Sequence, residues 1–141
     1  MEPVIREITG PDLAHGFLES LAALAEVNLS FEEAAEVLRA RMRAGIRTYV
    51  ACIGDRVVGT VSVVIEQKFI HKGGKIGHIE DVAVHPDHRH LRIGSVLVRH
   101  AIAQARRLGC YKVILSCFER LVPFYESLGF RKHDLGMRID L

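Results

Sequence analysis

The sequence predicts an α/β fold, an α+β sandwich in which helices pack on a mixed, twisted sheet. The chain has 141 residues, enough for one domain with a sizeable core. Hydrophobic residues make up 49% of it and charged residues 26%, as in a soluble globular protein. Apolar segments with strand-like and helix-like spacing follow the order β-α-α-β-β-β-α-β-α-β-β, without a linker or repeat. We therefore expect a single domain over residues 1–141, with about seven strands flanked by four helices.

The first third of the chain is predicted to form one strand and two helices. Residues 4–8 have the composition of a strand. A helix is expected to begin near residues 9–12, where a proline and an acid stand in the first turn. Its predicted core positions recur at helical spacing: Leu13, Phe17, Leu18, Leu21 and Leu24. The second helix should begin at Ser30, which forms a capping box with Glu33, and end at Gly45.

The remaining elements are predicted mainly from strand-like runs and glycine turns. Residues 48–53 and 57–66 flank a Gly-Asp turn and indicate a β-hairpin. Another glycine turn, at 72–75, leads to a strand over 77–84, and a helix is expected over 96–105. A strand over 111–116 and a short helix over 120–127 follow. The ranges 130–133 and 136–141 are expected to be the last two strands.

Composition excludes several functional classes. A net charge of +2, with no tryptophan, gives no basis for nucleic-acid binding. The apolar runs are too short to span a bilayer, and the N-terminus lacks signal-peptide architecture, so we expect a cytoplasmic protein without membrane contact. The three cysteines have spacings that suit neither a zinc site nor a disulfide framework. His85, His88 and His90 crowd one loop, but without ligand spacing, and we expect no metal.

One loop has the chemistry of an anion-binding site. Residues 87–95 (Asp-His-Arg-His-Leu-Arg-Ile-Gly-Ser) connect a predicted strand to a predicted helix. The first N–H groups of a helix lack intrahelical partners and carry partial positive charge. Arg89 and Arg92 add to that field, so a phosphate or pyrophosphate would fit. The pattern alone is equally compatible with a solvated loop that opens an ordinary helix.

Two segments resemble the GNAT N-acetyltransferases, whose element order matches nearly the whole chain. Residues 82–86 (Val-Ala-Val-His-Pro) followed by 89–95 are similar to the loop that binds the pyrophosphate of acetyl-CoA. Residues 122–130 (Val-Pro-Phe-Tyr-Glu-Ser-Leu-Gly-Phe) are similar to the C-terminal helix and turn of these enzymes. The resemblance implies a GNAT fold and acetyl-CoA as co-substrate. One departure is Arg92, which stands where that loop often carries glycine.

Three further segments are most similar to the glucosamine-6-phosphate N-acetyltransferases. They are residues 68–71 (Lys-Phe-Ile-His), 77–82 (Gly-His-Ile-Glu-Asp-Val) and 110–117 (Cys-Tyr-Lys-Val-Ile-Leu-Ser-Cys). This resemblance implies direct transfer of acetyl, in a ternary complex, to the 2-amino group of glucosamine 6-phosphate. It also implies a homodimer in which subunits exchange C-terminal strands and share the sugar site.

The resemblance gives each part of the reaction candidate residues. Backbone groups of a strand edge would hold the pantetheine arm, and loop amides and side chains would hold the pyrophosphate. The implied cofactor-binding residues are Val82, Ala83, Val84, Arg89, His90, Leu91, Arg92, Ile93, Gly94, Ser95 and Tyr125.

The implied catalytic residues are Tyr125, Glu80 and Asp81. The Tyr125 phenol would protonate the leaving thiolate, since a thiol and a phenol have pKa values of about 8.5 and 10. Glu80 and Asp81 are adjacent acids within an apolar strand, expected to point to opposite faces and to orient the amine or accept its proton. The alternatives are a packed helix tyrosine and, for the acids, one structural ion pair beside one solvated carboxylate.

Cations near the sugar phosphate complete the predicted site. The implied substrate-binding residues are Lys68, Phe69, Ile70, His71, Glu80, Asp81, Tyr111, Lys112 and Arg138. Lys112 would act from the neighbouring subunit, and any of these cations could equally be an ordinary surface charge. The family's C-terminal arginine aligns more nearly with Asp140 than with Arg138.

Two departures keep other functions open. Ser116 stands where the most similar relatives carry an acid, and Leu121 where they carry asparagine. These favour a second possibility, acetylation of another small-molecule amine or a protein amino group. A third is a non-catalytic acetyl-CoA-binding regulatory module, against which the presence of Tyr125 and the acid pair argues.

Overall fold

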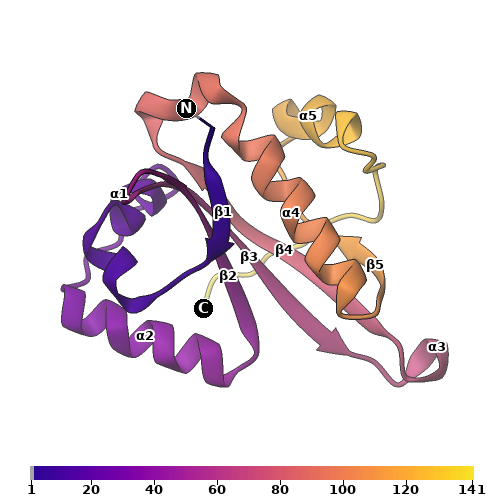
Figure 1. Cartoon of the computed structure of the whole chain (residues 1–141). Helices are drawn as coiled ribbons and strands as arrows, with labels where there is room; N and C mark the ends of the chain where they lie inside the picture. Colours follow the sequence, from indigo (N-terminus) through magenta and orange to yellow (C-terminus); the bar gives the residue numbers. More distant parts are fainter. Residues whose placement is uncertain (1) are drawn as a thin grey trace.

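A single sheet organises the molecule. In the computed structural model of the chain, residues 2–141 are described, with only the backbone course given for His90 and Leu91. Five strands of this part of the chain pair in the order β1-β2-β3-β4-β5 (Figure 1). The first three pairings are antiparallel, and β4 pairs with β5 in parallel. The strands are β1 (Val4–Glu7), β2 (Ile46–Ile53), β3 (Arg56–Gln67), β4 (Lys75–Val84) and β5 (Cys110–Ile114).

Helices cover both faces of this sheet. Tyr49 and Ala51 of β2 join a core beneath α4, whereas Val50 and Cys52 join a second core beneath α1 and α2. This alternation follows from the two-residue period of a strand. The α-helices are α1 (Phe17–Leu21), α2 (Phe31–Arg43), α3 (Ile70–Gly73), α4 (Ile93–Arg107) and α5 (Val122–Ser127). Three 3-10 turns are η1 (Gly10–Ala14), η2 (Pro86–Leu91) and η3 (Glu119–Leu121).

The predicted start and end of the second helix are confirmed. The Glu33 amide donates to Ser30 Oγ at 3.1 Å, and the Ser30 amide donates to the Glu33 carboxylate at 3.0 Å. These reciprocal bonds satisfy N–H groups that a helix start leaves without partners. Gly45 follows the helix with φ of 77°, a left-handed conformation that glycine adopts without steric cost.

The first helix was predicted to be continuous, and this prediction is wrong, because two short helical segments, η1 and α1, form instead. Gly16 has φ of 105° and separates η1 from α1. A Cβ there would collide with the carbonyl oxygen of Val57, so strand β3 approaches the backbone too closely for any other residue. Leu24, predicted to be core, lies past the end of α1 and is 52% exposed.

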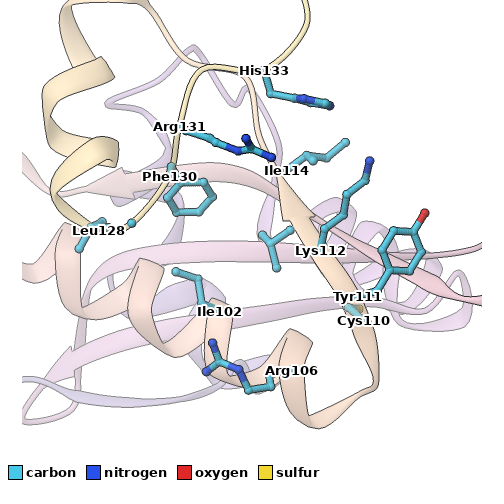
Figure 2. A pocket seen from close by; sticks show the side chains of 12 residues that line it. Ile102, Arg106, Cys110, Tyr111, Lys112, Ile114, Leu128, Phe130, Arg131 and His133 are labelled. Atoms are coloured by element: carbon cyan, nitrogen blue, oxygen red, sulfur yellow. The ribbon is translucent and has the colours of Figure 1, made fainter.

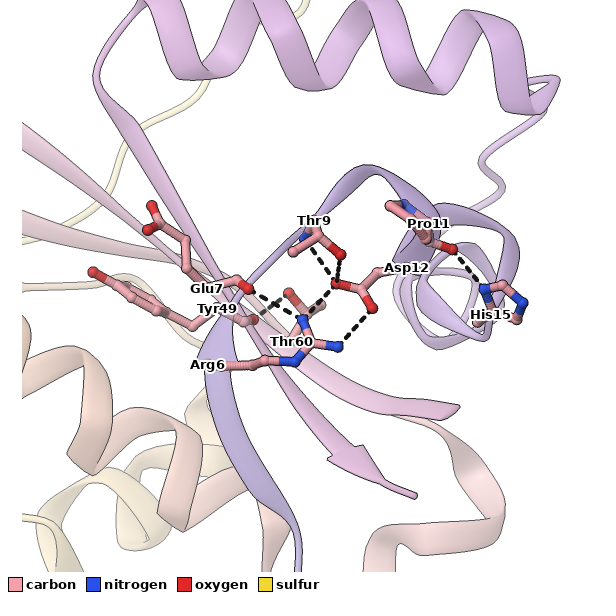
Figure 3. Close-up of polar contacts among 8 residues, drawn as sticks. All are labelled: Arg6, Glu7, Thr9, Pro11, Asp12, His15, Tyr49 and Thr60. Carbon is pink, nitrogen blue, oxygen red and sulfur yellow. Dashed lines mark hydrogen bonds and ion pairs between the residues drawn. The ribbon is translucent and has the colours of Figure 1, made fainter. Parts of the chain in front are cut away.

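An ion pair closes the N-terminal segment onto the sheet (Figure 3). The guanidinium of Arg6 donates to both carboxylate oxygens of Asp12, at 2.7 and 2.8 Å. The amide and hydroxyl of Thr9 donate to the same carboxylate at 2.7 and 3.0 Å. With Arg6 as the main cause, these donors lower the pKa of Asp12 to about 2. The buried carboxylate therefore stays ionised and fixes the chain between β1 and η1.

The predicted strand count is wrong at the C-terminus. In the described chain the sheet has five strands, not about seven, and five α-helices accompany it, not four. The ranges 130–133 and 136–141 contain no strand. The alternating apolar side chains of residues 135–141 are exposed, from 83% to 116%: Leu135, Met137, Ile139 and Leu141. A strand needs a paired neighbour, and in this single copy the segment has none, while β5 is the last strand of the sheet. Within the described residues, no helix combines the length and apolarity needed to cross a bilayer.

Candidate active site

A β-bulge in β4 shapes the predicted acid pair. Across β3, Ser62 faces Glu80 but Thr60 faces Ala83, so β4 carries one extra residue between them. Asp81 takes the resulting left-handed conformation, with φ of 51°. Such a conformation costs a non-glycine residue roughly 1–3 kcal/mol and is concentrated at functional sites.

The acids lie within β4, as predicted, but the bulge changes the strand geometry on which their expected orientation was based. Both Glu80 and Asp81 are exposed, not set in an apolar strand interior, and the bulge interrupts simple alternation. Neither carboxylate takes part in an ion pair among the described side chains. Asp81 lines a small cavity of about 90 Å³ with Arg41 and Ser62. Both acids are therefore accessible to an amine.

The parallel pairing of β4 with β5 ends early and leaves an open strand edge. Only residues 75–78 of β4 pair with β5, whereas β4 continues to Val84. Figure 1 shows β4 and the chain after β5 separating towards α5. The predicted pantetheine contacts Val82, Ala83 and Val84 lie on this unpaired half. Its backbone groups on the β5 side can bind an extended, amide-containing ligand as another strand would.

The anion-binding loop continues from this edge. Arg92 is left-handed, with φ of 56° and ψ of 27°, which explains why glycine is usual at its position. Helix α4 begins directly after it, without a side-chain cap on its first N–H groups. A Cβ on Gly94 would lie 3.8 Å from Val84 and 3.7 Å from Phe124, so this helix start adjoins both the end of β4 and α5.

The side chains of this loop divide by their exposure. Arg89 and Arg92 are exposed, Ser95 donates to the Arg92 carbonyl oxygen at 2.9 Å, and Ile93 is fully buried as a packing residue. The predictions for His90 and Leu91 fall on residues whose side chains are not described. Free amides and two exposed guanidiniums thus lie beside the open edge of β4, an arrangement suited to a pyrophosphate.

Tyr125 is a buried tyrosine without a polar partner. It is 8% exposed and packs edge-on against Phe124 and Phe130, with ring centroids 4.9 and 5.8 Å away. No hydrogen bond among the described residues involves its hydroxyl. It lines a cavity of about 450 Å³ that also includes Ser116 and Cys117 from the chain after β5.

The surroundings of Tyr125 keep its phenol protonated. Burial raises its pKa, and the nearby Cys117 thiol adds to the shift. A neutral phenol with no partner can donate its proton to a ligand atom in the cavity.

The predicted sugar-phosphate residues gather at the tip of the β3–β4 hairpin. His71 stacks on the Tyr111 ring with centroids 4.3 Å apart, and Lys112 Nζ lies 5.9 Å from the same ring. Lys68 Nζ is 3.2 Å from Glu66, which also binds His78 at 2.9 Å. Phe69 and Ile70, at the same tip, are strongly exposed, at 102% and 60%.

A second, basic cavity adjoins this cluster (Figure 2). It has a volume of about 580 Å³ and lies against β5 and α4. Lys112 enters it from β5, Arg106 from α4, and Arg131 and His133 from the chain after α5. The sequence did not predict Arg106, Arg131 or His133 as site residues, because the cavity is formed by three separate segments of the chain. The only available signal was that Arg131 directly follows the predicted helix-and-turn segment.

Within one chain, the predicted phosphate residues and the predicted reaction centre are far apart. Glu80 is five residues along β4 from Lys75 at the hairpin tip, roughly 17 Å at the rise of a strand. Tyr125 lies at the other end of β5, where it lines a cavity with residues 113–117 and shares a core with Val82 and Val84 of β4. Arg138 joins neither group and pairs with Asp140 at 2.7 Å in the exposed C-terminal segment.

Comparisons with known proteins identify similar proteins over almost the whole chain. Residues 14–130 match the acetyltransferase (GNAT) family. The glucosamine 6-phosphate N-acetyltransferase of Trypanosoma brucei brucei is 44% identical over 97% of this chain and 95% of its own length. The Arabidopsis thaliana protein of the same name is 32% identical over 94% of this chain and 93% of its own. The crystal structure of glucosamine-6-phosphate N-acetyltransferase from Arabidopsis thaliana superposes with a TM-score of 0.94 at 30% identity, covering 99% of each chain.

Proposed function

The chain belongs to the acetyltransferase (GNAT) family, and we propose from this that it acetylates the 2-amino group of glucosamine 6-phosphate with acetyl-CoA. The substrate rests on the relatives that carry this activity in their names, at 44% and 32% identity over almost the whole chain. The observation that carries the chemistry is Tyr125, whose hydroxyl has no polar partner among the described residues. Its buried ring packs in one core with Ile79, Val82 and Val84 of β4, and it lines a cavity at the end of β5.

The residues present fit acetyl-CoA. The uncapped start of α4, with Arg89 and Arg92, would hold the pyrophosphate. On the β5 side, where β4 has no paired strand, the backbone groups of Val82, Ala83 and Val84 would bind the amides of the pantetheine arm. Bound acetyl-CoA supplies an acetyl thioester, whose carbonyl carbon accepts the amine and whose sulfur leaves.

Tyr125 serves the leaving group. Its raised pKa keeps the phenol protonated at neutral pH, so it can donate to the departing sulfur. Positioned proton transfer of this kind contributes about 10²–10⁴-fold to a rate. Its rigid aromatic packing fixes the hydroxyl before the reaction begins.

The acid pair serves the amine. Glu80 and Asp81 are exposed, Glu80 directly before the bulge and Asp81 within it, near the start of the part of β4 that does not pair with β5. One carboxylate orients the amine by accepting a hydrogen bond, and the other, directly or through water, takes the proton that nitrogen loses when it forms the amide bond.

A second copy of the chain completes the site. The phosphate-binding candidates lie far along the sheet from Glu80 of the same chain: roughly 17 Å or more for Lys68 and His71, and roughly 13 Å for Lys112, which pairs with Ile76. We therefore assign them to the site of a partner subunit. The exposed apolar residues of 135–141 alternate as in a strand, and the outer edge of β5 is the surface where such a strand from the partner would pair.

Sedimentation of the purified chain tests the dimer. We expect twice the mass of one chain, and a truncation after Asp134 should sediment as a monomer without turnover. A monomeric full-length enzyme with normal activity would contradict the shared site.

Substrate competition tests the function itself. Purified protein is assayed for thiol release from acetyl-CoA with glucosamine 6-phosphate, glucosamine, and a lysine-containing peptide. We expect rapid release only with glucosamine 6-phosphate, together with the N-acetylated sugar by mass. Turnover of the peptide or another amine in its absence would overturn the substrate, and no turnover with any amine would overturn the activity.

A further inference from the structure

Cys117 shares the cavity of the proposed reaction centre. It is exposed, and it lines the same space of about 450 Å³ as Tyr125. Tyr125 is more than nine-tenths buried, and its hydroxyl has no polar partner among the described residues. Cys117 lies close enough to raise the pKa of this phenol electrostatically. In the proposed mechanism the sulfur of the acetyl donor lies beside this phenol. The donor sulfur and the Cys117 sulfur would therefore be neighbours in one cavity.

We infer that Cys117 is a redox-sensitive modification site that forms a mixed disulfide with coenzyme A in the donor site. The inference rests on the proposed function, because coenzyme A would bind where we place acetyl-CoA, along the open edge of β4 and at the start of α4. The modified protein would hold coenzyme A covalently in the space that the donor needs, and acetyl transfer would stop until a thiol reductant released it.

The modification is a disulfide exchange with the oxidised dimer of coenzyme A. The Cys117 thiol loses its proton to solvent, and the thiolate attacks the nearer sulfur of the bound disulfide. A new S–S bond joins Cys117 to the bound coenzyme A half. The original S–S bond breaks, and the other half leaves as a thiolate that takes up a proton. One disulfide is consumed and one is formed, so no further oxidant is needed.

The other two thiols are poorly placed for this exchange. Cys52 is 3% exposed within the core beneath α1 and α2, and burial raises its pKa. Cys110 is half-buried, lines the adjoining basic cavity beside β5 but not the cavity of Tyr125, and also has its pKa raised by burial. Since the thiolate is the reactive form, the structure favours Cys117 on both access and position.

Intact-protein mass spectrometry tests the inference. The purified full-length protein is incubated with coenzyme A disulfide, and separately with glutathione disulfide at equal concentration. We expect one coenzyme A adduct that dithiothreitol removes, forming about tenfold faster than the glutathione adduct because the donor groove holds the reagent in place. Acetyl-CoA present in excess should slow the coenzyme A reaction, and peptide mapping should place the adduct on Cys117.

Variants separate this site from general thiol reactivity. Cys117→Ser should take up no coenzyme A, while the matched variant Cys110→Ser should react as the wild type does. Each variant's activity is compared with its own value before oxidation. An adduct on Cys110, equal rates with the two disulfides, or no protection by acetyl-CoA would overturn the inference.

Wild-type turnover with glucosamine 6-phosphate, measured in the same preparation, distinguishes the two failures. Turnover without a coenzyme A adduct refutes only the modification site. Absence of turnover with every amine refutes the proposed function, whatever the adduct shows.

Discussion

The guanidinium of Arg41 donates to the hydroxyl of Ser62 at 2.6 Å and joins helix α2 to strand β3 directly opposite Glu80. It also donates to Thr48 at 3.2 Å, and both hydroxyl-bearing residues are 3% exposed. Arg41 thus satisfies two buried polar groups next to the bulge that holds the acid pair.

Replacement of Arg41 should destabilise the fold. Arg41→Leu leaves Ser62 and Thr48 without this donor, and we expect the free energy of unfolding to fall by about 1–3 kcal/mol, measured by urea denaturation. The matched change Arg39→Leu, at an exposed position of the same helix, should alter it by less than about 0.5 kcal/mol. Equal effects of the two substitutions would show that the buried hydrogen bonds contribute nothing.

Tyr125→Phe removes the proposed proton donor and little else. We expect kcat to fall about 10²-fold with the KM for acetyl-CoA little changed. Tyr49→Phe is the matched control, since Tyr49 is also buried and its hydroxyl also has no partner, but it lies in the core beneath α4. A Tyr125→Phe enzyme with at least half of the wild-type kcat would assign Tyr125 to packing alone.

The roles of Glu80 and Asp81 can be distinguished by comparing the reaction rates of their variants across a range of pH. Glu80→Gln or Asp81→Asn, whichever removes the proton acceptor, should lower kcat about 10²-fold near pH 7. That deficit should shrink at higher pH, where the free amine loses its proton to solvent before it binds. Glu36→Gln, on the exposed face of α2, is the control. Activity within a factor of two of wild type in both variants would contradict proton transfer at this position.

Arg92 permits a test that separates charge from backbone strain. Arg92→Ala and Arg92→Gly both remove the guanidinium, so each should raise the KM for acetyl-CoA by about two- to fivefold at low salt. Only glycine adopts the left-handed conformation of position 92 without steric strain. The glycine variant should therefore be more stable than the alanine variant by about 1 kcal/mol in thermal unfolding. An unchanged KM in both would mean that the Arg92 side chain does not reach the phosphates.

The Arg6–Asp12 pair should give the protein an acid-sensitive step in stability. The pKa of Asp12 is about 2 in the fold, against an ordinary value near 3.8, so the carboxylate contributes stability above pH 4. That contribution, about 2 kcal/mol, is lost as the pH falls from about 4 to about 2. Asp12→Asn should remove the step and lower stability at neutral pH, as followed by circular dichroism. Asp55→Asn in the exposed β2–β3 turn should leave the step in place.

Local signals in the sequence predicted the elements that depend on local chemistry. The Ser30–Glu33 cap, the Gly45 terminus and the Gly-Asp hairpin need only near neighbours in the chain, and all three are confirmed. The same holds for the strand–loop–helix order around Arg92, although residue type alone did not predict its left-handed backbone.

Features that depend on distant contacts were missed or mistaken. The break at Gly16 follows from the approach of β3, and the exposure of Glu80 and Asp81 follows from a bulge set by the register with β3. The ranges 130–133 and 136–141 were expected to be strands. The apolar alternation of residues 135–141 indicates a preference for pairing but not whether the same chain supplies the neighbour.

The early separation of β4 and β5 makes the donor a structural component as well as a reactant. Within the part of the chain that the structure describes, residues 79–84 of β4 have no paired strand on the β5 side. The pantetheine arm, lying along this edge, would take the place of that strand. By mass action, donor at a hundred times its Kd would add about 2.7 kcal/mol to the stability of the folded state. The enzyme would then last longest in a cell that is rich in acetyl-CoA, and starvation for the donor would expose a strand edge prone to unwanted association.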